Sequence, residues 1–303
     1  MKNRNIFLSF LVTGVTLITF LGGCKGTKQA ASPAATSSVA EEKALLWKIS
    51  GKDLTQDSYL YGTIHIIGAK DFVITDEVKS AFAATDKLVL ELDMDDPKMM
   101  MTMMSGAMMK DGKTLKDLIS AEDYQMVSDF FRDSVGMPLM AVEKMMPMLA
   151  LSSIYPKMLG DKTESYELSF MKMAKKAEKE VLGVESIEDQ LAIFSEISYE
   201  DQAAYLVDYL KKFDYYRSEF RKMVDLYVAR DLPGLYDFMM SFPEMEGQEE
   251  AMLDNRNKKW IPVMEEMAAT QSNFFAVGAG HLPGEQGVIS LLRKAGYTLT
   301  PVQ

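Results

Sequence analysis

Both histidines of the chain occur in the same local pattern, after an apolar run and three residues beyond a glycine. The two segments, 62–65 and 278–281, end in His65 and His281. Glycine accounts for 19 of 303 residues, so chance would place it before both histidines in less than about half a percent of cases. A neutral imidazole is the commonest metal ligand and also transfers protons near pH 7. The repeated pattern indicates a metal site or an acid–base site that uses both histidines.

Two glutamates occur in matching positions and can supply the carboxylates that such a site needs. Glu91 ends the apolar run 88–90, and Glu185 follows the run 181–184. Burying an unpaired carboxylate is costly, so we expect each glutamate to face a cation, a histidine or an arginine. A metal site needs more than two ligands, and carboxylates commonly complete it. The alternative for Glu91 is an ordinary strand-end acid in solvent, beside the acidic residues between 93 and 96.

The spacing of apolar residues predicts strands at both ends of the chain and mainly helices between about 97 and 270. Strands are expected at 44–49, 58–65, 87–92, 180–185, 273–277 and 296–302. Helices are expected at 76–85, with Asp76 as N-cap, and at 116–119, 121–132, 139–158, 164–180, 187–196, 200–229, 232–241, 249–270 and 287–295. We therefore expect an α+β or α/β domain over 44–303, in which a sheet from the two termini carries a helical insert.

The order of strand, glycine, histidine and helix is expected around both histidine motifs, although the chain has no repeat of fixed period. Glycine allows a tight backbone turn. Sheets of α/β proteins bind ligands at the loops that follow the carboxyl ends of their strands. We therefore expect two related half-sites whose histidines face one shared crevice.

The first 23 residues have the composition of a secretory signal peptide. Basic residues precede the apolar run 6–20, which is shorter than the roughly 20 residues that span a bilayer. Residues 21–24 then resemble the bacterial lipobox, which implies cleavage before Cys24 and its lipidation; the alternative is an uncleaved signal anchor. Residues 24–43 are rich in serine, alanine and threonine and predict a flexible tether. We expect a lipid-anchored protein of the cell envelope, on the periplasmic or extracytoplasmic face of a membrane.

Composition and charge limit the partners of the remaining chain. Apolar residues make up 48% and charged residues 25%, which is enough to build a hydrophobic core. The net charge of −11 becomes −13 without the signal peptide, because 31 basic and 44 acidic residues remain. A chain this acidic repels phosphate backbones, which argues against nucleic-acid binding. The single cysteine excludes an internal disulfide and a zinc site built from cysteines.

Methionine is concentrated in one segment, because residues 94–148 contain 14 of the 25 methionines. One interpretation is a surface for soft metals or for varied apolar ligands. The other is a flexible helical lid that is packed with an adaptable apolar residue. We favour the lid, because the segment contains neither histidine nor cysteine.

Several local motifs carry a resemblance to a known family. No His-Glu-x-x-His, Gly-x-Ser-x-Gly, Gly-x-Gly-x-x-Gly or P-loop pattern is present, so common zinc-protease, serine-hydrolase and nucleotide-binding motifs do not apply. The chain instead resembles the TraB/GumN family, which is similar to the Tiki proteases, over roughly residues 44–303. The segments that carry this resemblance are 61–65, 90–93, 182–185 with Gln190, 255–257 with Trp260, and 277–284 with Gly287.

The resemblance implies a fold related to the erythromycin esterase and ChaN-like group, and a metal-dependent peptidase activity. It implies a divalent ion such as zinc, manganese or cobalt on His65, His281 and Glu91. Glu185 would be a further ligand or the general base that activates water. Arg256 would pair a carboxylate or stabilise an oxyanion.

Two functions therefore stay open. The first is a metal-dependent hydrolase, favoured as a peptidase on peptides of the cell envelope. The second is a non-catalytic lipoprotein that sequesters a peptide, a metal or a haem-like ligand. A metal-free acid–base site built from the same residues is also open, and the sequence does not define the oligomeric state.

Overall fold

The computed structural model describes residues 43–160, 162–195, 197–242 and 249–303. The predicted signal peptide, Cys24 and all but the last residue of the predicted tether lie outside these ranges. Within them, no helix is both long enough and apolar enough to cross a membrane.

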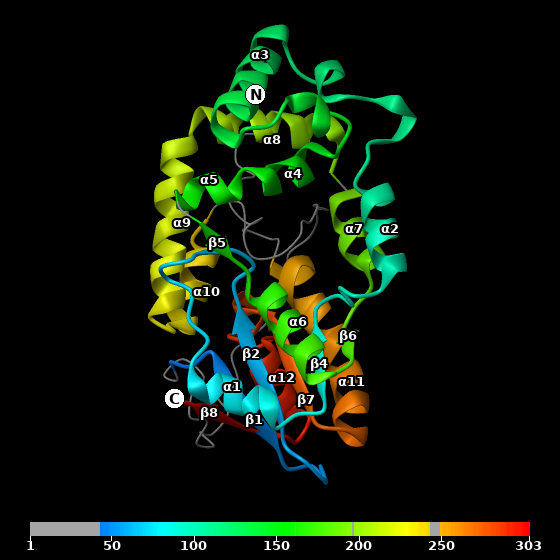
Figure 1. The fold of residues 1–303 in the computed structure, drawn as a ribbon, viewed down its shortest axis with the longest axis vertical. Helices are drawn as coiled ribbons and strands as arrows, with labels where there is room; N and C mark the ends of the chain where they lie inside the picture. The colour runs from blue at the N-terminus through cyan, green and yellow to red at the C-terminus, as the bar shows by residue number, and fades with distance from the viewer. Residues whose placement is uncertain (1–42, 161, 196, 243–248) are drawn as a thin grey trace, which may run out of the picture.

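A mixed six-stranded sheet forms the base of the molecule, with the strand order β6-β4-β7-β2-β1-β8 (Figure 1). Strands β6, β4, β7 and β2 run parallel, and β1 is antiparallel to both of its neighbours. The strands are β1 (Leu46–Ser50), β2 (Ser58–Thr63), β4 (Lys87–Leu90), β6 (Val181–Gly183), β7 (Asn273–Gly278) and β8 (Thr298–Val302). The expected sheet from both termini, with a helical middle, is confirmed as a mixed α/β arrangement consistent with the α+β class.

The parallel register brings the carboxyl ends of the central strands to one edge. Thr63 at the end of β2 pairs with Gly278 at the end of β7, and Leu90 of β4 lies between Ala276 and Gly183. Every residue of β7 is buried, as expected for a parallel strand covered on both faces. The segments that leave β2, β4, β6 and β7 therefore begin side by side.

Helices cover both faces of the sheet and also stand over this carboxyl edge (Figure 1). In Figure 1, α1 and α6 lie in front of the sheet, α11 and α12 behind it, and the other helices rise above or beside it. A short sheet of β3 (Ile67–Gly68) and β5 (Thr163–Glu164) lies between the six-stranded sheet and the helices above it. The helices are α1 (Asp76–Ala83), α2 (Pro97–Gly106), α3 (Ala121–Phe130), α4 (Pro147–Ala150), α5 (Tyr155–Leu159), α6 (Tyr166–Ala177), α7 (Ile187–Ser195), α8 (Tyr199–Lys211), α9 (Phe213–Val228), α10 (Leu232–Met240), α11 (Asn255–Thr270) and α12 (Val288–Lys294).

Several predicted helices are shorter than their periodicity suggested. The expected helix 139–158 is a series of short turns and helices, because Pro147 and Pro156 each stand in the first turn of a new helix. The expected helix 200–229 divides at Lys212, whose φ of −115° and ψ of 26° are not helical.

Three further details of the expected helices differ. The expected helix 116–119 is a 3-10 turn at Leu115–Asp117. The expected helix 249–270 begins with a π-helical segment at Glu250–Asp254. The N-cap of α1 is Thr75 rather than Asp76, because the Thr75 hydroxyl accepts a hydrogen bond from the backbone N–H of Val78.

The glycine of the first histidine motif permits close packing rather than a turn. Gly62 lies within β2 and has no positive φ, so the expected glycine turn is wrong there, whereas Gly278 ends β7 directly before the 3-10 turn Ala279–His281. A Cβ on Gly62 would lie 3.1 Å from the Leu282 side chain and 3.2 Å from Ala279, so the second motif packs against the first. The segment after His65 forms β3 and not the expected helix.

Gly183 has a similar role where β4 and β6 end. A Cβ at this position would lie 2.5 Å from the backbone nitrogen of Asp93 and 2.9 Å from the carbonyl carbon of Leu92. Two residues later, the Glu185 backbone N–H donates to the Glu91 carbonyl at 3.0 Å. The missing side chain therefore lets the two glutamate segments approach each other.

Gly183→Ala is expected to destabilise the fold by about 1–3 kcal/mol, because the new methyl group must displace backbone atoms. Gly68→Ala is the matched control, since its Cβ would make only an ordinary contact with Asp71 at 3.6 Å. Urea unfolding of both variants measures the difference. Equal unfolding free energies for the two variants would contradict the close approach.

Candidate functional site

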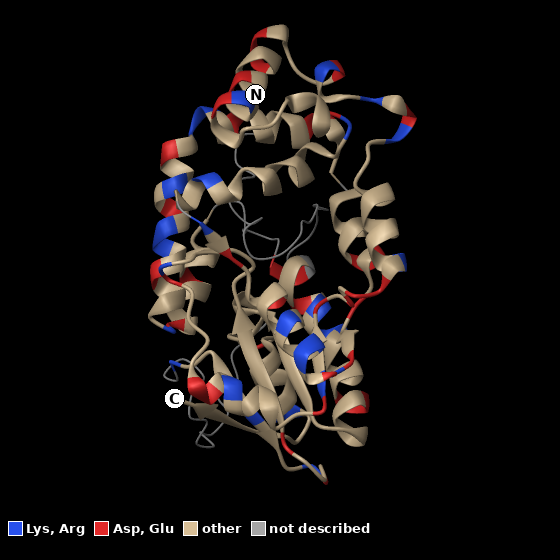
Figure 2. Ribbon diagram, viewed as in Figure 1, with Lys and Arg blue, Asp and Glu red and all other residues tan. Residues whose placement is uncertain are grey.

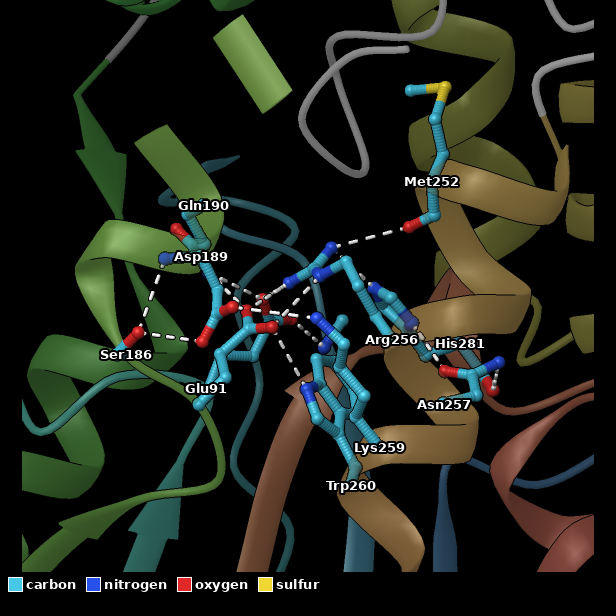
Figure 3. Close-up of polar contacts among 12 residues, drawn as sticks. Glu91, Ser186, Asp189, Gln190, Met252, Arg256, Asn257, Lys259, Trp260 and His281 are labelled. Carbon is cyan, nitrogen blue, oxygen red and sulfur yellow. Dashed lines mark hydrogen bonds and ion pairs between the residues drawn. The ribbon is translucent and has the colours of Figure 1, made fainter. Parts of the chain in front are cut away.

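Arg256 contacts three of the predicted site residues. Figure 3 shows it beside Glu91 and His281. Its Nη2 donates to Glu91 Oε2 at 2.7 Å, and its Nη1 donates to His281 Nε2 at 3.0 Å. Nε and Nη2 together bind both oxygens of Glu185, with an Nε–Oε2 distance of 3.1 Å. The side chains of Arg256, Glu91 and Glu185 are only 7%, 10% and 6% exposed, so these are buried ion pairs.

Four elements supply this cluster. Glu91 directly follows β4, Glu185 lies two residues after β6, and His281 ends the 3-10 turn Ala279–His281 after β7. Arg256 lies in the first turn of α11, just after the π-helical segment, and its Nη1 also donates to the Met252 carbonyl at 3.4 Å. The structure thus brings together Glu91, Glu185, Arg256 and His281, as the sequence predicted.

The two carboxylates have further hydrogen-bond donors. Glu91 Oε1 accepts from the Gly278 backbone N–H at 2.8 Å. Trp260 Nε1 donates to Glu185 Oε2 at 3.0 Å, and Gln190 Nε2 lies 2.7 Å from Glu185 and 3.3 Å from Glu91. A buried ion pair is stable only when its remaining polar atoms are satisfied, and these bonds meet that requirement.

His281 is neutral and carries its proton on Nδ1. The Asn257 amide nitrogen donates to the carbonyls of Gln286 at 2.9 Å and His281 at 3.4 Å, which leaves Asn257 Oδ1 facing His281 Nδ1 at 2.6 Å. Nδ1 must therefore donate, and Nε2 accepts from Arg256. Burial, the charge of Arg256 and that of His65 all lower the pKa of His281 well below 6.5.

Trp260 closes this network from one side. Its ring centroid lies 4.3 Å from that of His281 and 4.9 Å from the Arg256 guanidinium carbon. A cation against an aromatic face in a desolvated site is stabilised by the charge distribution of the ring. The Trp260 ring therefore fixes the positions of both partners.

Arg256 has no N–H left for an oxyanion. A guanidinium has five N–H donors, and those of Arg256 face Glu91, Glu185, His281 and the Met252 carbonyl. Stabilising an oxyanion would require breaking one of these bonds. Of its two expected roles, the geometry therefore favours the pairing of carboxylates.

His65 has very different surroundings, although β2 and β7 are neighbours. Its side chain is 50% exposed, and Nδ1 lies 2.9 Å from Oε1 of Glu167, a residue in the first turn of α6. Glu167 also accepts from Thr63 Oγ1 at 2.6 Å and Ser165 Oγ at 2.8 Å. Among the described residues, His65 Nε2 has no hydrogen-bond partner. The two motifs are therefore not equivalent half-sites.

The Glu167 carboxylate keeps His65 charged. The protein atoms around the half-exposed His65 ring partly desolvate it and lower its pKa, as does the charge of Arg256. The charge and hydrogen bond of Glu167, with the charge of Glu91, outweigh these effects and raise the pKa to about 9. Burial raises the pKa of Glu167, but the charge and hydrogen bond of His65 and the bond from Thr63 lower it to about 2. At neutral pH the pair is an imidazolium and a carboxylate.

The predicted metal ligands do not form a free donor set in this arrangement. Both oxygens of Glu91 and both ring nitrogens of His281 are already hydrogen-bonded. Among the described residues, no group of three or more His, Cys, Asp or Glu side chains is placed to hold an ion. The positive charge beside Glu91 and His281 comes from Arg256, so the residues as arranged do not fit a metal.

Sequence reasoning did not identify Glu167. It lies 102 residues from His65 along the chain, in a helix whose first turn commonly contains acids. Its burial at 8% exposure is the feature that distinguishes it, and no local pattern indicates that burial. Asn257 and Gln190 were noted only as parts of family motifs, and their bonds to His281 and the two glutamates give them positioning roles.

A mixed sheet with a buried network at its carboxyl edge is thus the framework of this protein. The chain belongs to the TraB/PrgY/gumN family, whose model matches residues 45–301. No curated protein and no solved structure shows a significant match to the chain.

The two histidines are expected to titrate separately, which two-bond ¹H–¹⁵N spectra of the imidazole rings can resolve. His281 should stay neutral with its proton on Nδ1, whereas His65 should titrate near pH 9. Because its folded-state pKa is raised, His65 contributes stability that is complete below pH 6.5 and is lost as pH rises through about 9. Glu167→Gln should lower the pKa of His65 toward 6.5. Titration of both rings near 6.5 in the unmodified protein would contradict these assignments.

Arg256→Gln is expected to destabilise the protein by about 3–5 kcal/mol, because two buried carboxylates lose their cation. Adding Glu185→Gln should restore part of this loss, since one of the uncompensated charges is removed. The control is Arg132→Gln, whose side chain is 60% exposed and should contribute less than about 1 kcal/mol. Urea unfolding compares the variants, and an Arg256→Gln protein as stable as the control would refute the pairing.

Proposed function

We propose that the protein is a hydrolase that cleaves peptides of the cell envelope, with the reaction beside His65. One observation carries the proposal: the His65 imidazole is half exposed, while Glu167 holds its Nδ1. A histidine oriented by a carboxylate, with its other nitrogen open, is the usual arrangement for proton transfer to a substrate. Membership of the TraB/PrgY/gumN family is compatible with this activity.

The proposed role of His65 is that of a general acid. With a pKa of about 9, it is an imidazolium at neutral pH and its Nε2–H can be donated. When water attacks a peptide carbonyl carbon and the bond to nitrogen breaks, His65 gives this proton to the leaving nitrogen. The proton of the attacking water is released to solvent, and His65 is reprotonated from solvent.

The Arg256 cluster has a supporting role in this proposal. Glu91 and Glu185 carry two negative charges against one on Arg256, so the cluster is net negative beside neutral His281. The charge of Glu91 raises the pKa of His65. Glu91 thus favours the protonated form that a general acid needs, against the opposing charge of Arg256, and the cluster fixes the strand ends around the reacting group.

A divalent ion on His65, His281 and Glu91 stays a prediction of the family resemblance. In the described arrangement it would require Arg256 to release Glu91 and His281. No step of the proposed reaction is therefore assigned to a metal.

The second candidate function is a non-catalytic binding lipoprotein. The observation that favours it is that all five N–H donors of Arg256 are already hydrogen-bonded. A fully bonded network is also what a rigid structural scaffold needs. Turnover distinguishes the two functions.

Cleavage of a peptide library by the full-length protein in detergent, followed by mass spectrometry, tests the hydrolase. His65→Gln should reduce the rate at least about 100-fold, because the proton donor is lost. Glu167→Gln should move the loss of activity at high pH from about 9 to a lower pH, since it lowers the pKa of His65.

The matched control is Glu180→Gln, an exposed carboxylate whose partner, Lys87, lies at the opposite end of β4 from Glu91. It should leave the rate and its pH profile unchanged. Absence of cleavage by folded protein would reject the hydrolase in favour of the binding lipoprotein. Cleavage that His65→Gln does not slow would refute His65 as the proton donor.

We also propose that the protein is lipid-anchored through Cys24 on the extracytoplasmic face of a membrane. Support comes from the lipobox-like segment 21–24 alone. Cys24→Ala should abolish metabolic labelling with a radioactive fatty acid and the matching increase in mass. Retention of the label in this variant would refute the anchor.

A further inference from the structure

Met99 of α2 is buried, but three other methionines of this helix lie on the surface of the molecule. Met100, Met101 and Met104 are 41%, 62% and 63% exposed, and Met108 just beyond the helix is 42% exposed. Within the described residues, none of these four belongs to the hydrophobic core or packs against it. The packed lid favoured from the sequence therefore does not explain these side chains, and exposing so many large apolar groups needs another reason.

Three of the α2 methionines share one face of the helix. Met100, Met103 and Met104 stand at positions i, i+3 and i+4, where neighbouring Cβ atoms are about 5–6 Å apart. A methionine side chain is unbranched and flexible, so its sulfur can reach toward a common point. We propose that these three thioethers form a binding site for a soft monovalent cation, Cu(I) or Ag(I).

The chemistry of the helix selects this class of ion. Thioethers are neutral soft ligands, which favour Cu(I) and do not hold Mg²⁺ or Ca²⁺. The segment 99–109 contains no carboxylate that would hold a harder ion. Figure 2 shows α2 almost without charge beyond its first turn. The net charge of −11 favours the approach of any cation.

The site is separate from the histidine motifs. Helix α2 packs against α7, and Gly106 approaches the Leu191 side chain on that side. Helix α7 also contains Gln190, which bonds to Glu91 and Glu185. Helix α2 is thus next to the helix that carries Gln190, but the proposed thioether site shares no residue with the candidate active site.

Isothermal titration of the full-length protein with Ag(I), in chloride-free buffer and detergent, tests the site. A Cys24→Ser background removes the only thiol, which would otherwise bind silver. The unmodified α2 should bind one Ag(I), and Met100→Leu/Met103→Leu/Met104→Leu should weaken binding at least tenfold, or about 1.4 kcal/mol. Leucine keeps the apolar surface and the helix propensity, so only the sulfurs are lost.

The matched control is Met126→Leu/Met137→Leu/Met140→Leu, which removes three sulfurs of the same methionine-rich segment outside α2. It should bind Ag(I) as tightly as the unmodified protein, and so should His65→Gln/His281→Gln. Equal binding by the α2 triple variant would overturn the proposal. Absence of Ag(I) binding to any form would also overturn it and would leave α2 as an apolar docking surface.

Discussion

The pairing of Arg256 with two buried carboxylates is the interaction on which the carboxyl edge of the sheet depends. Glu91 and Glu185 follow neighbouring strands, and their charges would repel each other without a cation between them. The desolvation cost of three buried charges is met only because the side chains of Gln190 and Trp260 and a backbone N–H complete the hydrogen bonding. The helix that carries Arg256 is therefore held against strand ends that lie far from it in sequence.

This constraint gives the two histidines opposite properties. His281 is enclosed by Arg256, Asn257 and Trp260, and a second positive charge there is unfavourable, so the ring stays neutral. His65 lies at the exposed end of the neighbouring strand, where Glu167 supplies a negative charge of its own. The same short motif thus produces a buried hydrogen-bond acceptor in one place and an accessible proton donor in the other.

The sequence predicted most of the sheet and the convergence of four site residues. The convergence was predictable because the carboxyl ends of parallel strands lie at the same edge of a sheet. It did not predict that His65 is charged and exposed while His281 is neutral and buried. This difference depends on Glu167 and Asn257, which lie on other helices. Helix lengths were overestimated where apolar periodicity continued through Pro147 and Lys212. The roles of Gly62 and Gly183 were also not predictable. Gly62 packs against Ala279 and Leu282, which lie far away in sequence, and Gly183 packs against Leu92 and Asp93, which follow another strand.

We conclude that Arg256 supplies the positive charge of the site. Elemental mass spectrometry of the full-length protein, soaked with zinc, manganese or cobalt and then desalted, tests this most directly. We predict no stoichiometric metal that depends on the two histidines. Near-stoichiometric metal in the unmodified protein, lost in an equally folded His65→Ala/His281→Ala variant, would contradict it and establish the metal centre that the family resemblance implies.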